Sequence, residues 1–311
     1  IAAQYTTTSD FERGWMSGLE SWSTPDQLQL GGASGVLPYL WIPNDNDNSI
    51  SKVDTRTGRE LARYRTGPNS IVGNPSRTTV DLQGNCWVAN RNSATVVKVG
   101  LLEHGNFEDR NGDGLVQTSR DLNGDGAITG AELLDWGKDE CVLHEVLLTP
   151  GSENRYTPGT FRGTYPNNYW NPGPRGMAVD ARGNLWAGTH DSMWYYSIDG
   201  ETGAILRAID VSTVNHMAYG AAIDSRGILW SSGYKDSGEQ NLLRLDPSDG
   251  SFTKTVVDFH SYGIAPDRND HLFVSGHQES VLTRWNLLTG KQDWKISVGA
   301  NPRGIAITDD N

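Results

Sequence analysis

The sequence predicts an all-β protein folded as a β-propeller of five four-stranded blades. A unit of about 43 residues recurs along the chain, each copy reads as a series of short strands, and the two chain ends carry complementary fragments of one unit. Four antiparallel strands in a unit of this length are the pattern of a propeller blade. The 36 glycines, 11 tryptophans and 11 tyrosines agree with a turn-rich β protein.

The recurring unit is clearest in the stretch "PRGMAVDARGNLWAGTHDSMWYYSID". Each copy has an apolar strand, a turn that begins with aspartate, an apolar-aromatic strand, a polar loop and a third strand, and a fourth strand follows after a second turn. The copies span residues 75–99, 174–199, 218–246 and 261–286. The first two copies are further apart than the others, which indicates an insertion of about 55 residues between them.

The chain ends predict how the ring closes. Residues 37–67 have the second, third and fourth strands of a blade, whereas residues 301–311, "NPRGIAITDDN", read as a lone first strand. We expect this C-terminal strand to complete the N-terminal blade, because closure hides both sheet edges. If the native chain continues past Asn311, the blade count rises and this closure fails. The predicted propeller therefore spans residues 37–311.

Residues 1–36 precede the repeat and form an N-terminal extension. Two interpretations remain open: a strap packed against the propeller, or a strand that adds to a neighbouring molecule and makes a homo-oligomer.

An insertion at residues 101–140, within the second blade, carries the sharpest motif. Residues 121–132, "DLNGDGAITGAE", match the calcium loop of the EF-hand. A hard cation of this size takes about six to eight oxygen ligands, and glycine at the sixth place permits the sharp turn. We predict Ca²⁺ here, with Glu132 at the start of a short helix "GAELLDW". The predicted ligands are Asp121, Asn123, Asp125, the carbonyl of Ala127, Thr129 and Glu132.

A related loop precedes it and is less complete. Asp109, Asn111, Asp113 and the carbonyl of Leu115 fit the pattern, but the twelfth position is Arg120. Either Asp121 is shared between two ions or another group closes the first loop. One calcium ion is therefore predicted, and a second stays open.

The two cysteines, Cys86 and Cys141, fall at the same end of the second predicted blade. A disulfide there would staple the base of the insertion in an oxidising compartment. One strand lies between them, however, and two strand spacings amount to about 9–10 Å, which exceeds disulfide reach without local bending. Both states remain open.

A second set of candidates surrounds the predicted funnel mouth. In antiparallel blades, the start of each innermost strand and the loop after each second strand lie on one side of the disc, where ligand sites gather. This places eight residues together: Arg91, Arg175, His190, Tyr219, Tyr234, Tyr262, His277 and Arg303. In an enzyme, His190, His277, Arg175 and Arg303 would be catalytic. The insertion is expected on the opposite face.

Composition excludes some classes of function. The chain has 26 basic and 38 acidic side chains, net −12, which argues against nucleic acid because phosphate neutralisation needs clustered cations. No run of about 18 apolar residues is present, so no transmembrane segment is predicted. The start at Ile1 fits a mature form after signal-peptide removal and fits a recombinant start equally well.

The stretches "PRGMAVDARGNLWAGT" and "NPRGIAITDDN" resemble the blade signature of NHL-like and streptogramin-lyase-like β-propellers. The tandem loops resemble those of EF-hands and dockerins. The lyases carry an aromatic-Thr-Glu sequence after the blade tryptophan, and the matching stretches here, such as "WAGTH", lack that glutamate. The resemblance therefore implies the fold more than an activity.

The predicted function is that of a secreted or cell-surface calcium-binding propeller. It would act as a binding or structural module in adhesion or self-assembly, with a protein, a glycan or its own copies as partners. The alternative is a lyase or hydrolase with its active site at the funnel mouth.

Overall fold

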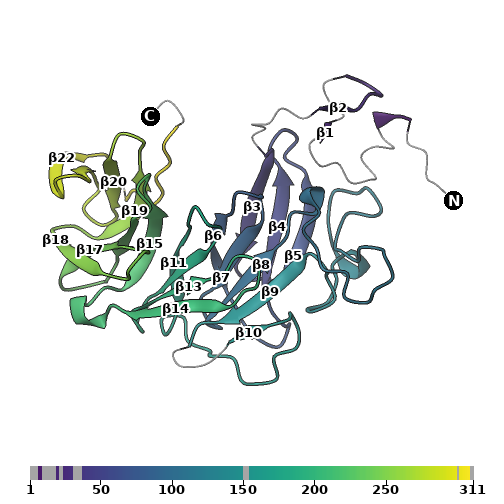
Figure 1. Ribbon diagram of the computed structural model, residues 1–311, viewed down its shortest axis with the longest axis horizontal. Coiled ribbons are helices and arrows are strands. Elements are labelled where there is room, and N and C mark those ends of the chain that lie inside the picture. The colour runs from purple at the N-terminus through teal and green to yellow at the C-terminus, as the bar shows by residue number, and fades with distance from the viewer. Residues whose placement is uncertain are drawn as a thin grey trace.

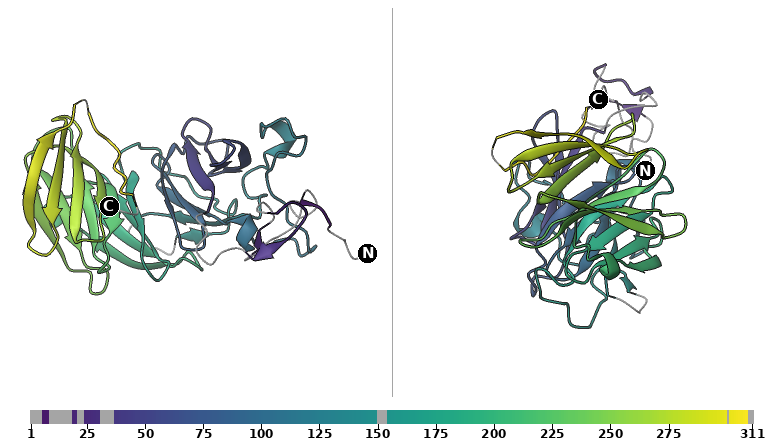
Figure 2. Two further views of the ribbon diagram at one scale, coloured as in Figure 1. Left: turned by 90° about the horizontal axis from the view of Figure 1, so that it is seen from above. Right: turned by 90° about the vertical axis from the view of Figure 1, so that its left-hand side faces the viewer.

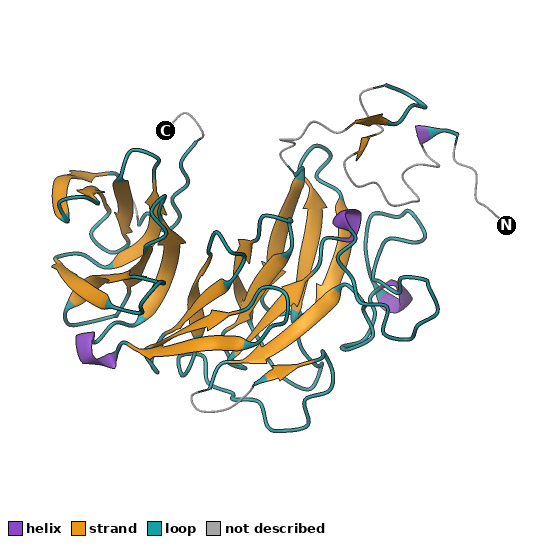
Figure 3. Ribbon diagram, viewed as in Figure 1, coloured by secondary structure: helices purple, strands orange, loops and turns teal. Residues whose placement is uncertain are grey.

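The computed structural model describes residues 6–8, 19–20, 24–30, 37–149, 154–299 and 301–308. The described chain is all-β, with five antiparallel sheets of three to five strands and a separate two-stranded hairpin. The large sheets follow one another along the chain as the successive blades of a β-propeller do (Figure 1). Helical structure in the described residues amounts to three short 3-10 turns and a single helical position at Thr8 (Figure 3).

Each large sheet is a meander whose strands pair in chain order. Sheet one contains β3 (Tyr39–Asn44), β4 (Ser49–Asp54) and β5 (Glu60–Arg65). Sheet two contains β6 (Pro75–Val80), β7 (Cys86–Asn90), β8 (Thr95–Val99), β9 (Val142–Leu147) and the short β10 (Arg155–Tyr156). Sheet three contains β11 (Pro174–Val179), β12 (Leu185–Thr189), β13 (Trp194–Ile198) and β14 (Ile205–Asp210). Sheet four contains β15 (Ala218–Ile223), β16 (Leu229–Gly233), β17 (Gln240–Leu245) and β18 (Phe252–Val257). Sheet five contains β19 (Ser261–Pro266), β20 (His271–Gly276), β21 (Val281–Asn286) and β22 (Lys291–Ser297).

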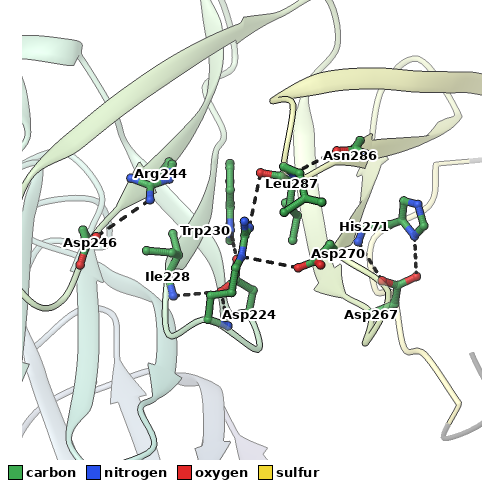
Figure 4. Close-up of polar contacts among 12 residues, drawn as sticks. Asp224, Ile228, Trp230, Arg244, Asp246, Asp267, Asp270, His271, Asn286 and Leu287 are labelled. Carbon is green, nitrogen blue, oxygen red and sulfur yellow. Dashed lines mark hydrogen bonds and ion pairs between the residues drawn. The ribbon is translucent and has the colours of Figure 1, made fainter.

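The recurring aspartate fixes the turn between the first two strands of a blade. Figure 4 shows the Asp224 carboxylate accepting hydrogen bonds from the backbone of Ile228 (3.0 Å) and the indole of Trp230 (3.0 Å). Asp180 makes the equivalent contacts in sheet three. The aspartate and the tryptophan six residues later are therefore one structural unit, because the charged acceptor satisfies turn amides and a buried indole together.

The apolar core lies between successive sheets. Between sheets one and two, for example, Trp41 and Tyr64 lie in one buried cluster with Val88 and Val97. Every residue of β7 is buried, since sheet two is covered on both faces. The outer face of sheet one is uncovered: Leu40 and Ile42 are 51% and 40% exposed. Each forgoes part of the roughly 1.5–3 kcal/mol that full burial of such a side chain contributes.

The predicted closure of the ring is not formed in the structure. Residues 301–308 are not a strand. The carbonyl of Arg303 lies against Gly263 of β19 and accepts a hydrogen bond from the hydroxyl of Ser275 in β20 (3.2 Å). Sheet one keeps three strands, and sheets one and five lie at opposite ends of the series (Figures 1 and 2). The "PRG" sequence lies against β19, the inner strand of the preceding sheet, without forming a strand. Sheet one stands at the other end of the series, so β3 is too far away to pair with it.

The N-terminal extension is described at a few positions. β1 (Leu19–Glu20) pairs with β2 (Gln29–Leu30) as a small hairpin. The rest of the strap-or-strand prediction falls outside the described residues. Within the described chain, no helix is long and apolar enough to span a membrane.

The insertion leaves the second blade between β8 and β9. Val99 at the end of β8 pairs with Cys86 and with Val142, so the insertion begins at the end of sheet two opposite Arg91. It contains two 3-10 turns, η1 (Leu102–His104) and η2 (Gly130–Glu132). The helix predicted for "GAELLDW" is limited to that second turn, because the backbone is already extended at Leu133 (φ −95°, ψ 102°).

The disulfide considered from the sequence is absent. Cys86 and Cys141 are free, buried thiols, and β8 stands between β7 and β9. Burial raises the pKa of the Cys86 thiol, and burial followed by the charge of Asp139 raises the pKa of Cys141 to about 12.

Candidate functional site

A β-bulge at the start of the inner strands aims three candidate residues at the mouth. Pairing of β11 with β12 skips Arg175, and pairing of β15 with β16 skips Tyr219. The shift between Ser261 and Ile264 does the same at Tyr262 in β19. A bulge adds a residue that the partner strand does not match and redirects its side chain. The repeat therefore presents equivalent positions of successive blades at one mouth.

Arg175 is the most buried of these side chains, at 1% exposed. Aromatic rings surround its guanidinium: Trp170 at 4.3 Å, Tyr169 at 4.8 Å and Tyr219 at 5.1 Å from ring centroid to Cζ. Its Nη2 donates to the carbonyl of Tyr169 (3.3 Å). Burial lowers the pKa of Arg175 from its usual value, although the group stays charged at neutral pH.

Tyr219 and Tyr262 form a hydroxyl pair, with their oxygens 2.8 Å apart. Burial raises the pKa of Tyr219 to about 12, and the neighbouring Tyr262 adds to the effect. Burial also opposes ionisation of Tyr262, but the Tyr219 hydroxyl and the charges of Arg77 and Arg303 outweigh it, so the pKa of Tyr262 is lowered. As pH rises, Tyr262 is therefore the first of the pair to lose its proton.

His190 lies at the same mouth with both ring nitrogens engaged. Nδ1 is 2.5 Å from the Asp191 carboxylate, and Nε2 is 2.9 Å from the carbonyl of Tyr234. Burial lowers its pKa, while these two acceptors oppose the shift. Because each nitrogen faces an acceptor, His190 has no ring lone pair directed to the cavity and serves to tie two blades together.

His277 is different, because its Nδ1 is buried and has no hydrogen-bond partner among the described residues. The ring lies 5.0 Å from Tyr262 and 6.0 Å from Tyr234, measured between centroids. Burial, then the charge of Arg303, lowers its pKa. A neutral imidazole with an unused nitrogen can accept a proton or a hydrogen bond.

The remaining predicted residues lie at the edges of this cluster. Arg91 stacks on Tyr169 (4.3 Å) and forms an ion pair with Asp45 (3.1 Å), so its charge is already balanced. Arg303 is exposed and lies over the Tyr262 ring at 6.0 Å. The structure therefore brings all eight predicted mouth residues into one connected cluster of rings and guanidiniums.

Three members of the cluster were missing from the predicted set. Arg77 of β6 stacks on Tyr219 (4.9 Å) and lines a cavity of about 620 Å³ together with Arg175 and Arg303. Tyr169 and Trp170 come from the loop before β11 and cover Arg175. Arg77 stands one position after the bulge, so alignment of the repeats on bulged residues did not select it. The "YW" pair gave a signal, since aromatic residues in a long loop need a packing partner.

The loop at residues 121–132, predicted to bind calcium, brings its carboxylates together. Oxygens of Asp121, Asp125 and Glu132 lie within 4.8 Å of one another. Backbone amides hold them: Gly126 donates to Asp121 (3.0 Å), and Leu122 donates to Glu132 (2.9 Å). This fits a hard cation, because three carboxylates converge on one point.

The first loop repeats the backbone hydrogen bonds of the second, but among the described residues its carboxylates do not form a converging group of three. Gly112 and Gly114 donate to Asp109 at 2.7 and 2.9 Å. Arg110 occupies the place of Leu122 in the second loop, and its amide donates to Glu140 (2.9 Å). Glu140, 3% exposed, thus takes the role that Glu132 has next door. Sequence spacing could not select it, because it lies far beyond the twelfth position.

An arginine from sheet one reaches the second loop. Arg59 Nη2 lies 2.7 Å from Asp121 Oδ2, and this contact is the main reason that the pKa of Asp121 is lowered. A cation bound by the loop would compete with Arg59 for this oxygen. The insertion is thereby linked to the first sheet as well as the second.

The fold and the mouth define the class: a β-propeller with a convergent aromatic-arginine mouth. No family model matches the sequence, and the search of curated proteins also found no match. Solved structures do match. A catalytically inactive variant of virginiamycin B lyase from Staphylococcus aureus, in complex with quinupristin, is 14% identical, with 86% of this chain and 69% of that chain covered and a TM-score of 0.57.

Two further structures are similar. A functionally unknown protein from Desulfotomaculum acetoxidans is 11% identical, covering 88% of this chain and 70% of that one, with a TM-score of 0.54. Dihydro-heme d1 dehydrogenase NirN is 11% identical, covering 86% of this chain and 45% of that one, with a TM-score of 0.50. At these identities the likeness shows the fold alone.

Proposed function

We propose that the protein is a secreted or cell-surface, calcium-braced β-propeller that binds a partner at its funnel mouth. The observation that carries the proposal is the separation of two sites. The carboxylate loops lie at one end of sheet two, and the aromatic-arginine cluster lies at the other. The location of the loops supports a structural role for the ion, because the insertion leaves sheet two at the end away from the convergent mouth.

Calcium would be held by the second loop through Asp121, Asp125 and Glu132, with Asn123, Thr129 and the Ala127 carbonyl completing the shell. In the first loop, Asp109, Asn111, Asp113 and the Leu115 carbonyl would act with Glu140. A bound ion stabilises the folded state by mass action, by about 2.7 kcal/mol at a free concentration a hundred times its dissociation constant. An extracellular calcium level keeps such loops filled, which supports the secreted or surface location.

Calcium titration of three variants tests the brace. In isothermal titration calorimetry we expect binding to the wild type, loss of one site in E132Q and loss of the other in E140Q. E108Q is the matched control, because Glu108 is exposed and outside both loop patterns. Chelation should lower the melting temperature of the wild type. No calcium heat together with an unchanged melting temperature would refute the brace.

The binding role itself includes adhesion and self-assembly. Sedimentation of a variant that lacks residues 1–36 tests whether self-assembly depends on this segment. An assembly that survives the deletion does not depend on that segment, whereas an assembly that is lost does.

A lyase or hydrolase is the second candidate. It is favoured by the unused Nδ1 of His277 beside the Tyr219–Tyr262 hydroxyl pair, and by the fold shared with virginiamycin B lyase. Incubation with quinupristin, followed by mass spectrometry, gives a direct test. Consumption by the wild type but not by H277A would support the enzyme, and an unchanged compound would exclude this substrate.

A further inference from the structure

The cavity at the funnel mouth has an unusual charge pattern for this acidic chain. Three arginines, Arg77, Arg175 and Arg303, are among its lining residues, and no aspartate or glutamate is, as far as the described residues go. The whole protein carries 38 acidic against 26 basic side chains. A concave site that gathers one sign of charge focuses the potential and attracts the opposite charge. The cavity is therefore suited to an anion.

The guanidinium of Arg175 has donor groups that an anion could satisfy. The aromatic rings cover the faces of its guanidinium, but Nε and Nη1 are buried and have no hydrogen-bond partner in the described chain. Stacking uses the face of a guanidinium and leaves the N–H donors at its edge free. A buried donor without an acceptor is costly, so an acceptor delivered by a ligand would satisfy this edge.

Two other buried cations make the contrast clear. Lys52 contacts Glu103 at 2.5 Å, and Lys98 lies 3.3 Å from Asp81. Both are paired with carboxylates of the chain, as buried charges generally are. Arg175 is 1% exposed, yet among described residues its contacts are to rings and one carbonyl. The described residues thus place aromatic rings around the guanidinium of Arg175 but no carboxylate beside it.

We propose that the cavity binds the oxyanion group, carboxylate or phosphate, of a small organic ligand, with the free edge of Arg175 as its main contact. Arg77 and Arg303 flank the group, and the hydroxyls of Tyr219 and Tyr262 provide hydrogen bonds to the rest of the ligand. Arginine suits both groups because its paired N–H donors match two oxygens. This proposal rests on the proposed binding function of the mouth and names the chemistry of its ligand.

The size of the cavity agrees with a compact ligand. Its volume of about 620 Å³ falls within the range of about 300–1,000 Å³ for small-molecule sites. Its lining combines apolar residues such as Met177 and Ile264 with the arginines and tyrosines. A ring-bearing molecule with one acidic group would fit within this space.

Three probes with one common ring test the proposal: glucose, glucuronate and glucose 6-phosphate. They differ in the substituent at C5 of the ring, which is a hydroxymethyl group, a carboxylate or a phosphorylated hydroxymethyl group. Titrated by calorimetry or NMR at low ionic strength, at least one of the two anions should bind tenfold or more tightly than glucose, and the stronger one identifies the group. Equal binding of all three, or no binding of either anion, would overturn the proposal.

Variants locate the site and separate it from effects on folding. R175M and R303Q should each weaken anion binding at least tenfold, and Arg303 is exposed, so its replacement leaves the core intact. The matched control is R207Q, since Arg207 lies on the outer strand β14. Without ligand, R175M should melt no lower than the wild type, because it removes a buried, unpaired charge. Anion binding unchanged in both cavity variants refutes the assignment.

The two proposals fail in different ways. Absence of calcium binding in the wild type, with normal anion binding, would remove the brace and leave the anion site standing. Normal calcium binding without anion binding would leave the brace and remove the anion site.

Discussion

Glu145 offers the sharpest test of the energetics, because its carboxyl is buried with half of its acceptors unused. It is 1% exposed in β9. The hydroxyl of Tyr165 donates to Oε1 (2.7 Å), while Oε2 has no hydrogen-bond partner among the described residues. Burial raises the pKa of Glu145 to about 7, from 4.5. The folded protein therefore holds this proton more tightly than the unfolded chain does.

The consequence is a stability that falls as pH rises. Between pH 4.5 and about 7 the unfolded chain has already lost the proton that the folded protein keeps, so the free energy of unfolding declines across this window. A shift of about 2.5 pKa units at about 1.4 kcal/mol each gives a penalty on the order of 3 kcal/mol above pH 7. Replacing the carboxylate with an amide keeps an acceptor for Tyr165 and removes the charge.

The assay is urea denaturation of the wild type and E145Q at pH 4.5, 6 and 8. We expect E145Q to be more stable by about 2–3 kcal/mol at pH 8 and the difference to shrink towards zero at pH 4.5. A gain that is equal at all three values, or a loss at pH 8, would refute the assignment of a buried, incompletely satisfied carboxyl.

Two further predictions concern other buried ionisable groups. E103Q should destabilise the protein by about 1.5–3 kcal/mol in the same urea assay, because it removes the charge partner of Lys52, which is 2% exposed. A loss below about 1 kcal/mol would mean that Lys52 reaches water. His216 is enclosed between Asn241 and Ser231, and burial lowers its pKa to about 4. Its imidazole NMR signals should therefore stay constant from pH 8 to 5, and its contribution to stability should be lost as pH falls from 6.5 towards 4; titration of these signals near pH 6.5 would contradict its burial.

Much of the architecture could be predicted because it depends on contacts between residues that are close together in the sequence. The aspartate turn, the aromatic residue six positions later and the alternation of the strands depend on contacts within one blade, such as Asp224 with Trp230. The sequence showed that no first strand precedes residue 37, but the predicted completion of sheet one by the C-terminal residues was wrong, and the sheet keeps three strands. The place of residues 301–308 could not be predicted, because it depends on how the sheets follow one another in space.

The candidate mouth was predicted as a group for the same reason. Equivalent positions of a repeat lie on equivalent sites of the fold, so aligning the blades selected Tyr219, Tyr262 and Arg175 together. Arg77 was missed because the bulge shifts the register by one residue in β6. Glu140 was missed because it lies 30 residues after Arg110 in the chain and is brought to the first loop by the folding of the insertion.

The sequence by itself determined the all-β class, the repeating sheet and the spacing of the three carboxylates that converge in the loop at residues 121–132, since each depends on residues close together in the chain. The tertiary structure decided which charges are balanced. Arg91 has Asp45 beside it, whereas Arg175 is enclosed by rings with its edge unpaired. Both are arginines at the same mouth, and their chemistry differs because pairing and burial arise from neighbours that lie on other blades.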